Sequence, residues 1–163
     1  MTKLQKWSTQ YVAILLALTI VMLLVPKISA AEYTASGATK FVFSNSGIAV
    51  TEGSYSGYKV DGTELTINAS GTYVVSGSCS DGSIKVKKDT AGVTLVLNGL
   101  NLTSLTTAPI ACNKSTEVNI VAVSGTTNTL TDSAQNNDDN YPGNEDAENA
   151  VIKCKDGSQV TIS

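Results

Sequence analysis

The sequence predicts an all-β protein built as a parallel β-helix, a solenoid with about three short strands in each coil. Two observations predict this fold. Beyond residue 31, apolar and polar residues alternate in short runs, and Gly, Asn, Asp or Ser separates the runs. Such runs are typical of β-strands. In addition, pairs of these runs recur in the same order at a nearly constant distance, which indicates a repeat architecture.

Three pairs of predicted strands carry the repeat. The first strand of each pair starts at Ile84, Ile110 or Ile152, and the second starts nine, eight and eight residues later. A third strand over residues 100–103 recurs over 127–131. One loop absorbs the longer interval between the second and third pairs. An antiparallel sandwich also uses alternating strands, but sandwich strands rarely repeat both sequence columns and spacing, which favours the solenoid.

Equivalent side chains of successive coils should stack in columns about 4.8 Å apart. The three isoleucines that start the first strands form one inward column, and Val86, Cys112 and Cys154 form the next. The two cysteines would act there as small buried hydrophobic residues, with a disulfide bond between them as the less favoured alternative. Cys79 lies near a predicted turn, and the sequence leaves its environment open.

The positions between the inward columns should face solvent. Four of them are lysines, which would form one basic stripe: Lys85, Lys87, Lys153 and Lys155. An earlier rung is expected over residues 65–67 and 73–75, with bends at Gly71 and Gly77.

The sequence divides into three predicted parts. Residues 1–31 precede the alternating runs, residues 32–60 should form an N-terminal strand and cap, and residues 61–163 should form the β-helix domain. The cap is needed because the open end of a β-helix exposes unpaired backbone groups. Ser163 falls inside a predicted second strand, so we expect an N-terminal fragment of a longer domain.

Residues 1–31 have the parts of a secretory signal peptide, including its apolar helix. Lys3 and Lys6 precede an apolar run over 11–25, and small residues at 29–31 precede a cleavage position before Glu32. The run is shorter than the roughly 20 apolar residues of a membrane-spanning helix, which favours cleavage over a membrane anchor. We therefore expect a secreted protein, extracellular or at the cell surface, without membrane contact after cleavage.

The composition excludes several classes of function. The 163 residues contain no histidine, and all eleven basic residues are lysines. Sites of the Ser-His-Asp or Cys-His type, histidine-bound zinc and arginine clamps for phosphate are therefore impossible in this sequence. Beyond residue 31 acidic residues outnumber lysines, and this net negative charge disfavours nucleic acid as a partner.

An acidic insert occupies residues 132–149, with six carboxylates and no lysine. Clustered oxygen ligands in a loop suit calcium, which takes roughly six to eight of them in variable geometry. The spacing is not that of an EF-hand, and a solvated, disordered loop is the competing interpretation. The candidate calcium ligands are Asp132, Asp138, Asp139, Asp146 and Glu148.

Four phrases of the sequence resemble a known family: residues 95–103, 108–110, 125–132 and 148–152. In their order and spacing they are similar to the secreted carbohydrate-binding right-handed β-helix proteins of bacteria, which are relatives of polysaccharide lyases. The resemblance runs from about Gly62 to Ser163. It implies a right-handed parallel β-helix that binds calcium and plant cell-wall polymers, including polygalacturonate, without cleaving them.

We therefore expect a secreted, non-catalytic module that binds an acidic plant cell-wall polysaccharide of the pectin type with calcium. One alternative is a calcium-dependent pectate lyase with a lysine base, although no lysine is distinguished by its sequence neighbours. Another is a cell-surface adhesin or structural β-helix. Paired carboxylates could hydrolyse glycosidic bonds, but the sequence places no two of them on a rigid strand.

Overall fold

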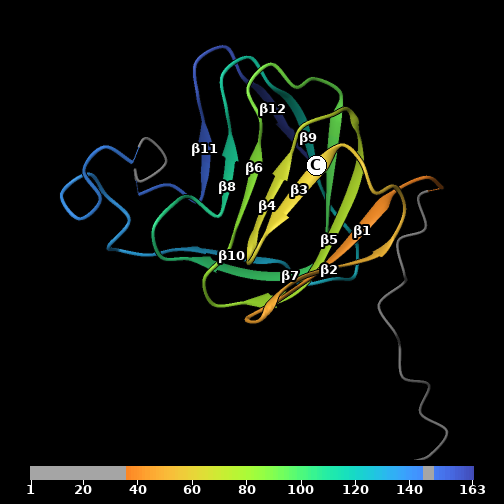
Figure 1. Ribbon diagram of the computed structural model, residues 1–163, viewed down its shortest axis with the longest axis horizontal. Helices are drawn as coiled ribbons and strands as arrows, with labels where there is room; N and C mark the ends of the chain where they lie inside the picture. The colour runs from red at the N-terminus through yellow and green to blue at the C-terminus, as the bar shows by residue number, and fades with distance from the viewer. Residues whose placement is uncertain (1–35, 145–148) are drawn as a thin grey trace, which may run out of the picture. The chain divides into compact units, whose positions relative to one another are not determined.

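The computed structural model describes residues 36–144 and 149–163, and within them it contains twelve β-strands and no helix (Figure 1). The all-β prediction is confirmed. The predicted signal peptide lies outside the described residues. In the part of the chain that is described, no helix is long and apolar enough to cross a membrane.

Seven strands form the larger sheet, in the order β12-β9-β7-β5-β1-β2, with β10 paired to β7. Its strands are β1 (Thr39–Ser44), β2 (Gly47–Glu52), β5 (Gly71–Cys79), β7 (Val93–Ser104), β9 (Glu117–Ala122), β10 (Thr129–Asp132) and β12 (Gln159–Ile162). Neighbouring strands from β1 to β12 along this order are parallel, and β10 is parallel to β7. Only the β1–β2 pair of this sheet is antiparallel.

Five strands form the second sheet, in the order β11-β8-β6-β4-β3. Its strands are β3 (Tyr58–Asp61), β4 (Glu64–Ile67), β6 (Ser83–Val86), β8 (Ile110–Cys112) and β11 (Ile152–Cys154). β4, β6, β8 and β11 are parallel, whereas β3 and β4 form an antiparallel hairpin. Both sheets are therefore mixed, each a parallel ladder that ends in an antiparallel hairpin strand.

The register of the five-stranded sheet confirms the predicted column of isoleucines. Ile84 pairs with Ile110, and Ile110 pairs with Ile152. The neighbouring column places Cys154 beside Cys112. Cys112 is fully buried as predicted, but Cys154 is exposed, so its assignment to the core is wrong. The reason is its position, because β11 is the outermost strand of its sheet and no described strand stacks on it.

The core lies between the two sheets. Side chains from both sheets form one buried cluster, which includes Leu65 and Ile110 from the smaller sheet and Leu95 and Ile120 from the larger one. Alternation along each strand turns these side chains inward. Each contributes roughly 1.5–3 kcal/mol by leaving water. Cys79 also belongs to this cluster, which settles the environment that the sequence left open.

Three further details differ from the sequence predictions. Residues 93–104 form one continuous strand, β7, so the predicted strand over 100–103 is not separate. Gly77 lies within β5, where the register with β7 shifts, and not at a bend between strands. Lys153 is only 7% exposed, so it does not extend the basic stripe into solvent. Its registered neighbour in β8 is Ala111. The small side chain of Ala111 leaves apolar surface beside it, and the aliphatic stem of a lysine readily covers such surface.

Three stacked turns follow β6, β8 and β11, and they share one backbone conformation. Asp89, Ser115 and Gly157 occupy equivalent positions with φ of 61°, 58° and 72°. The amide of Asp89 donates to the carbonyl of Lys114 at 3.0 Å, and that of Ser115 donates to the carbonyl of Asp156 at 3.2 Å. The ladder of the smaller sheet therefore continues through its turns, which places the side chains of the three turns in rows.

Candidate functional site

A groove of about 680 Å³ lies between the acidic insert and the ends of β8 and β11. The insert contributes Asp138, Pro142, Gly143 and Asn144 to its lining, and the ladder contributes Lys114, Lys153, Cys154, Lys155 and Asp156. A volume of this size is typical of ligand sites in proteins. The sequence analysis identified the insert and two of these lysines, but it missed Lys114 and the groove itself.

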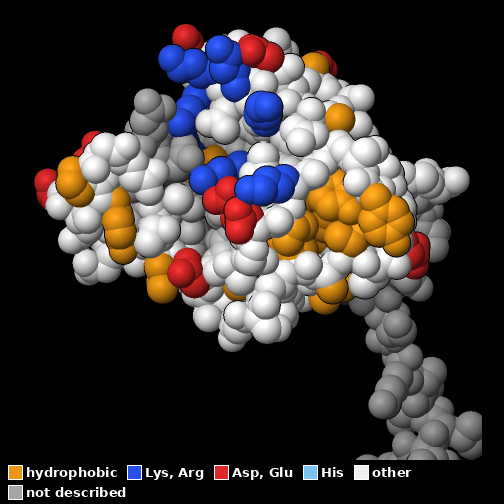
Figure 2. Space-filling view, in the orientation of Figure 1, with side chains coloured by type: hydrophobic (Ala, Val, Ile, Leu, Met, Phe, Trp, Pro, Cys, Tyr) orange, Lys and Arg blue, Asp and Glu red, His pale blue; other side chains and the backbone are white. Residues whose placement is uncertain are grey.

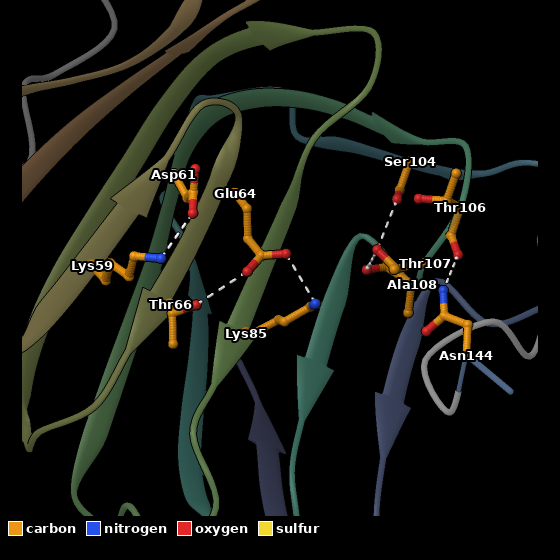
Figure 3. Close-up of polar contacts among 10 residues, drawn as sticks. All are labelled: Lys59, Asp61, Glu64, Thr66, Lys85, Ser104, Thr106, Thr107, Ala108 and Asn144. Carbon is orange, nitrogen blue, oxygen red and sulfur yellow. Dashed lines mark hydrogen bonds and ion pairs between the residues drawn. The ribbon is translucent and has the colours of Figure 1, made fainter.

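Backbone and amide hydrogen bonds attach the insert to the ladder. The amide of Ser133 donates to the carbonyl of Ser104 at 3.0 Å, where β10 leaves β7. Asn144 reaches back across the chain, and its Nδ2 donates to the carbonyl of Thr106 at 2.9 Å (Figure 3). These bonds fix the insert on the loop that precedes β8, so its residues form a wall beside the lysines.

The lysines of the groove differ in exposure. Lys114 is exposed on the turn after β8, Lys155 is half-buried on the turn after β11, and Lys153 is buried in β11. Among the charged lining residues these three face two carboxylates, Asp138 and Asp156. The groove therefore has an excess of positive charge on a chain whose net charge is −3. Such a local field attracts anionic ligands.

Two lysines of the strands β3 and β6 in the same sheet form ion pairs with carboxylates. Lys59 Nζ lies 2.8 Å from the carboxylate of Asp61, and Lys85 Nζ lies 2.9 Å from that of Glu64 (Figure 3). The hydrogen bond and the opposite charge raise the pKa of Lys59 and lower the pKa of Asp61. Lys59 and Asp61 are well exposed, so water screens the attraction and the pair stabilises the fold little.

Three of the five predicted calcium ligands lie within the described residues. Asp132 ends β10 and accepts a hydrogen bond from Nδ2 of Asn136. Asp138 borders the groove, whereas Asp139 is exposed. Asp146 and Glu148 lie outside the described residues. Within the described ranges, no three His, Cys, Asp or Glu side chains form a group that could hold a metal ion.

Asn136 is a residue of the insert that the sequence analysis did not select as a ligand. It is fully buried, and its Oδ1 has no hydrogen-bond partner among the described residues. An orphaned buried acceptor costs about 1–3 kcal/mol, and a cation would satisfy it. Carbonyl oxygens of Asn and carboxylates of Asp are ordinary calcium ligands. Asn136 Oδ1 and the carboxylate of Asp132 could supply two of the roughly six to eight oxygen ligands that calcium takes, and the amides of the insert were the available signal.

The two stacked cysteines have very different environments. Burial, together with the neighbouring Cys154, raises the pKa of the Cys112 thiol to about 12. Cys112 therefore stays a neutral thiol at physiological pH. Cys154 is exposed and borders the groove. All three cysteines of the described chain are free thiols.

One comparison with known proteins gives a match. A family model described as "Carbohydrate-binding domain-containing protein" matches residues 61–162. This range contains the insert and every residue that lines the groove. It also contains the five-stranded sheet, apart from Tyr58–Val60 of β3. No curated protein and no solved structure matches the chain.

Proposed function

Since the chain belongs to the family of carbohydrate-binding domain-containing proteins, we propose that its groove binds an acidic polysaccharide of the polygalacturonate type. The protein has a carbohydrate-binding role by its family, and the charge of the groove supports an anionic ligand. The observation that carries the proposal is the set of three lysines on one wall of a groove of about 680 Å³. The unesterified polygalacturonate of a plant cell-wall pectin offers one carboxylate on each sugar to these ammonium groups.

Calcium is part of this proposal. The residues that would hold it are Asp132 and Asn136, which meet at the base of the insert. The Oδ1 of Asn136, which has no hydrogen-bond partner in the described part of the chain, supports the assignment. A bound calcium ion would neutralise part of the acidic insert and so reduce its repulsion of a polyanion beside it.

The finer features of the fold and location are also proposals. The two parallel ladders support a right-handed parallel β-helix, because equivalent strands follow one another at fixed register in both sheets. The sequence of residues 1–31 supports secretion to the extracellular space or cell surface. Expression in a secreting host, followed by N-terminal sequencing of the exported protein, tests this, with Glu32 expected as the first residue.

Affinity electrophoresis tests the proposed ligand. The purified protein is run in gels that contain polygalacturonate or the fully methyl-esterified polymer, which has the same backbone without its charge. We expect retardation by polygalacturonate only, and weaker retardation with a calcium chelator. Equal mobility in all gels would refute the proposal.

Lys153 favours a second candidate function, cleavage of the polysaccharide by β-elimination. It is a lysine buried in the wall of the groove, where its amine would lie beside a bound sugar and within reach of a proton to be abstracted. Incubation with polygalacturonate and calcium should then produce unsaturated uronates, detected by their ultraviolet absorbance. A Lys153→Met variant that still binds would lose this activity, whereas no product from the wild-type protein would exclude the lyase.

A further inference from the structure

The three stacked turns after β6, β8 and β11 bring four lysines into two neighbouring rows. The amides of Lys87, Asn113 and Lys155 each donate to the carbonyl of the last residue of the neighbouring strand, β4, β6 or β8, at 2.8, 3.1 and 2.9 Å. These three residues are therefore equivalent and form one row. The next residues along the chain, Lys88, Lys114 and Asp156, form the second row.

The rows have a defined spacing. Adjacent rungs are about 4.8 Å apart, and positions two rungs apart are separated by roughly 10 Å. Lys88 and Lys114 are direct neighbours in their row, and Lys87 and Lys155 are separated by Asn113. Lys114 and Lys155 line the groove, and the exposed Lys87 and Lys88 continue the two rows beyond it along the stacked turns. Figure 2 shows lysine side chains gathered over the five-stranded sheet and its upper turns.

This arrangement is unfavourable for the protein alone. Like charges on directly opposite positions of neighbouring strands destabilise a sheet. Lys88 is 66% exposed, and the ion pair that it forms with Asp89 is long at 3.8 Å, so this contact compensates little. Asp156, on the other side of Lys114 in the row, offsets only part of the repulsion. A bound polyanion would relieve the repulsion between Lys88 and Lys114.

We propose that this turn-stack site, defined by Lys87, Lys88, Lys114 and Lys155, binds a run of about three consecutive uronates that lies along the stacking direction, one sugar for each rung. The inference rests on the proposed binding of acidic polysaccharide and adds the direction of the chain and its minimum length. A linear polyuronate suits the rows because it carries one carboxylate on each sugar and can therefore place several carboxylates along two parallel rows of ammonium groups. Asn113, between Lys87 and Lys155, offers an amide to the hydroxyl groups of the central sugar.

Two double variants separate this site from general electrostatic attraction. Lys88→Gln with Lys114→Gln removes two charges from the turn stack. Lys40→Gln with Lys59→Gln removes two charges elsewhere, from lysines paired with Glu52 and Asp61. Isothermal titration of trigalacturonate should show affinity reduced about tenfold in the first variant and less than about twofold in the second. Without ligand, the first variant should also have a slightly higher Tm, because its like-charge repulsion is removed.

Chain length gives an independent test. Affinity of the wild-type protein should rise from mono- to di- to trigalacturonate, and a fourth residue should add little. If the two double variants bind trigalacturonate equally, or if the monomer binds as tightly as the trimer, the turn-stack site is refuted while polysaccharide binding stands. If the wild-type protein binds neither the oligomers nor polygalacturonate, both the proposed function and this inference fail.

Discussion

Gly77 lies where the irregularity in β5 brings its backbone against β1. A Cβ atom at this position would lie 2.3 Å from the carbonyl oxygen of Phe43, and φ is +91°. Gly99 in β7 has a similar φ of +76°, but its Cβ would meet nothing within 4 Å. We expect Gly99→Ala to lower the free energy of unfolding by about 1 kcal/mol, from backbone strain alone. Gly77→Ala should cost about 3 kcal/mol or more.

Urea denaturation of the two glycine variants measures the difference. Because the strain in φ is common to both, the excess loss in Gly77→Ala reports the close contact between β5 and β1. Equal losses would mean that β1 moves away from β5 without cost.

Cys112 should make stability depend on alkaline pH. Its thiol has a pKa of about 12 in the folded protein against 9.0 for the unperturbed group. Above pH 9 the unfolded chain loses this proton while the folded chain retains it, so rising pH favours unfolding. The contribution is complete below pH 9 and declines by at most about 1.4 kcal/mol for each pH unit toward pH 12.

A Cys112→Val variant isolates this contribution, because valine is the residue at the equivalent position of β6. Between pH 8 and pH 10.5, the free energy of unfolding should fall more for the wild-type protein than for the variant. Parallel pH profiles would show that Cys112 ionises equally easily in both states.

At the scale of elements, Asn128 fixes the loop before β10 to the middle of β7. Its Oδ1 accepts hydrogen bonds from the amides of Gly99 and Leu100, both at 2.9 Å. Asn128→Ala leaves these two donors without their partner and should cost about 1–3 kcal/mol. Asn119→Ala, at an exposed position of β9, should stay within about 0.5 kcal/mol of wild type.

Hydrogen exchange locates the effect of Asn128. The amides of Gly99 and Leu100 should exchange faster in Asn128→Ala than in the Asn119→Ala control. Unchanged exchange at both amides would contradict the role of Asn128 in holding the loop before β10 against β7.

The alternating sequence pattern predicts some of the strands but not where each strand ends or which strand lies at the edge of its sheet. The first and second strands of the repeat were predictable because inward positions need apolar side chains at a period of two in either sheet. The continuity of β7 was not predictable, because Gly99 has the sequence character of a bend although its neighbours stay in the sheet. The exposure of Cys154 depends on which strand is outermost, and alternation along a strand contains no such information.

At the scale of the whole molecule, the groove could be predicted only in part. The acidic insert was evident from its composition, and Lys153 and Lys155 from the repeat. The path of the insert was not evident, because it depends on single contacts such as that between Asn144 and the carbonyl of Thr106, 38 residues apart. Asn136 was missed for the same reason, since its burial follows from the path of the insert and not from its residue type.

Calcium should stabilise the whole fold if Asn136 and Asp132 hold it. A ligand that binds only the folded state at about 100 times its Kd adds about 2.7 kcal/mol to the free energy of unfolding. Thermal unfolding with calcium and with a chelator should therefore give a higher Tm with calcium in the wild-type protein. Asn136→Leu removes Oδ1, which lacks a partner among the described residues, so it should abolish the calcium-dependent shift. It also removes the hydrogen bond to Asp132, so stability in chelator should fall by about 1 kcal/mol. Asn140→Ala, at an exposed amide of the same insert, should retain the shift. A calcium-dependent rise that persists in Asn136→Leu would place the ion elsewhere, and a wild-type Tm that does not respond to calcium would refute the site.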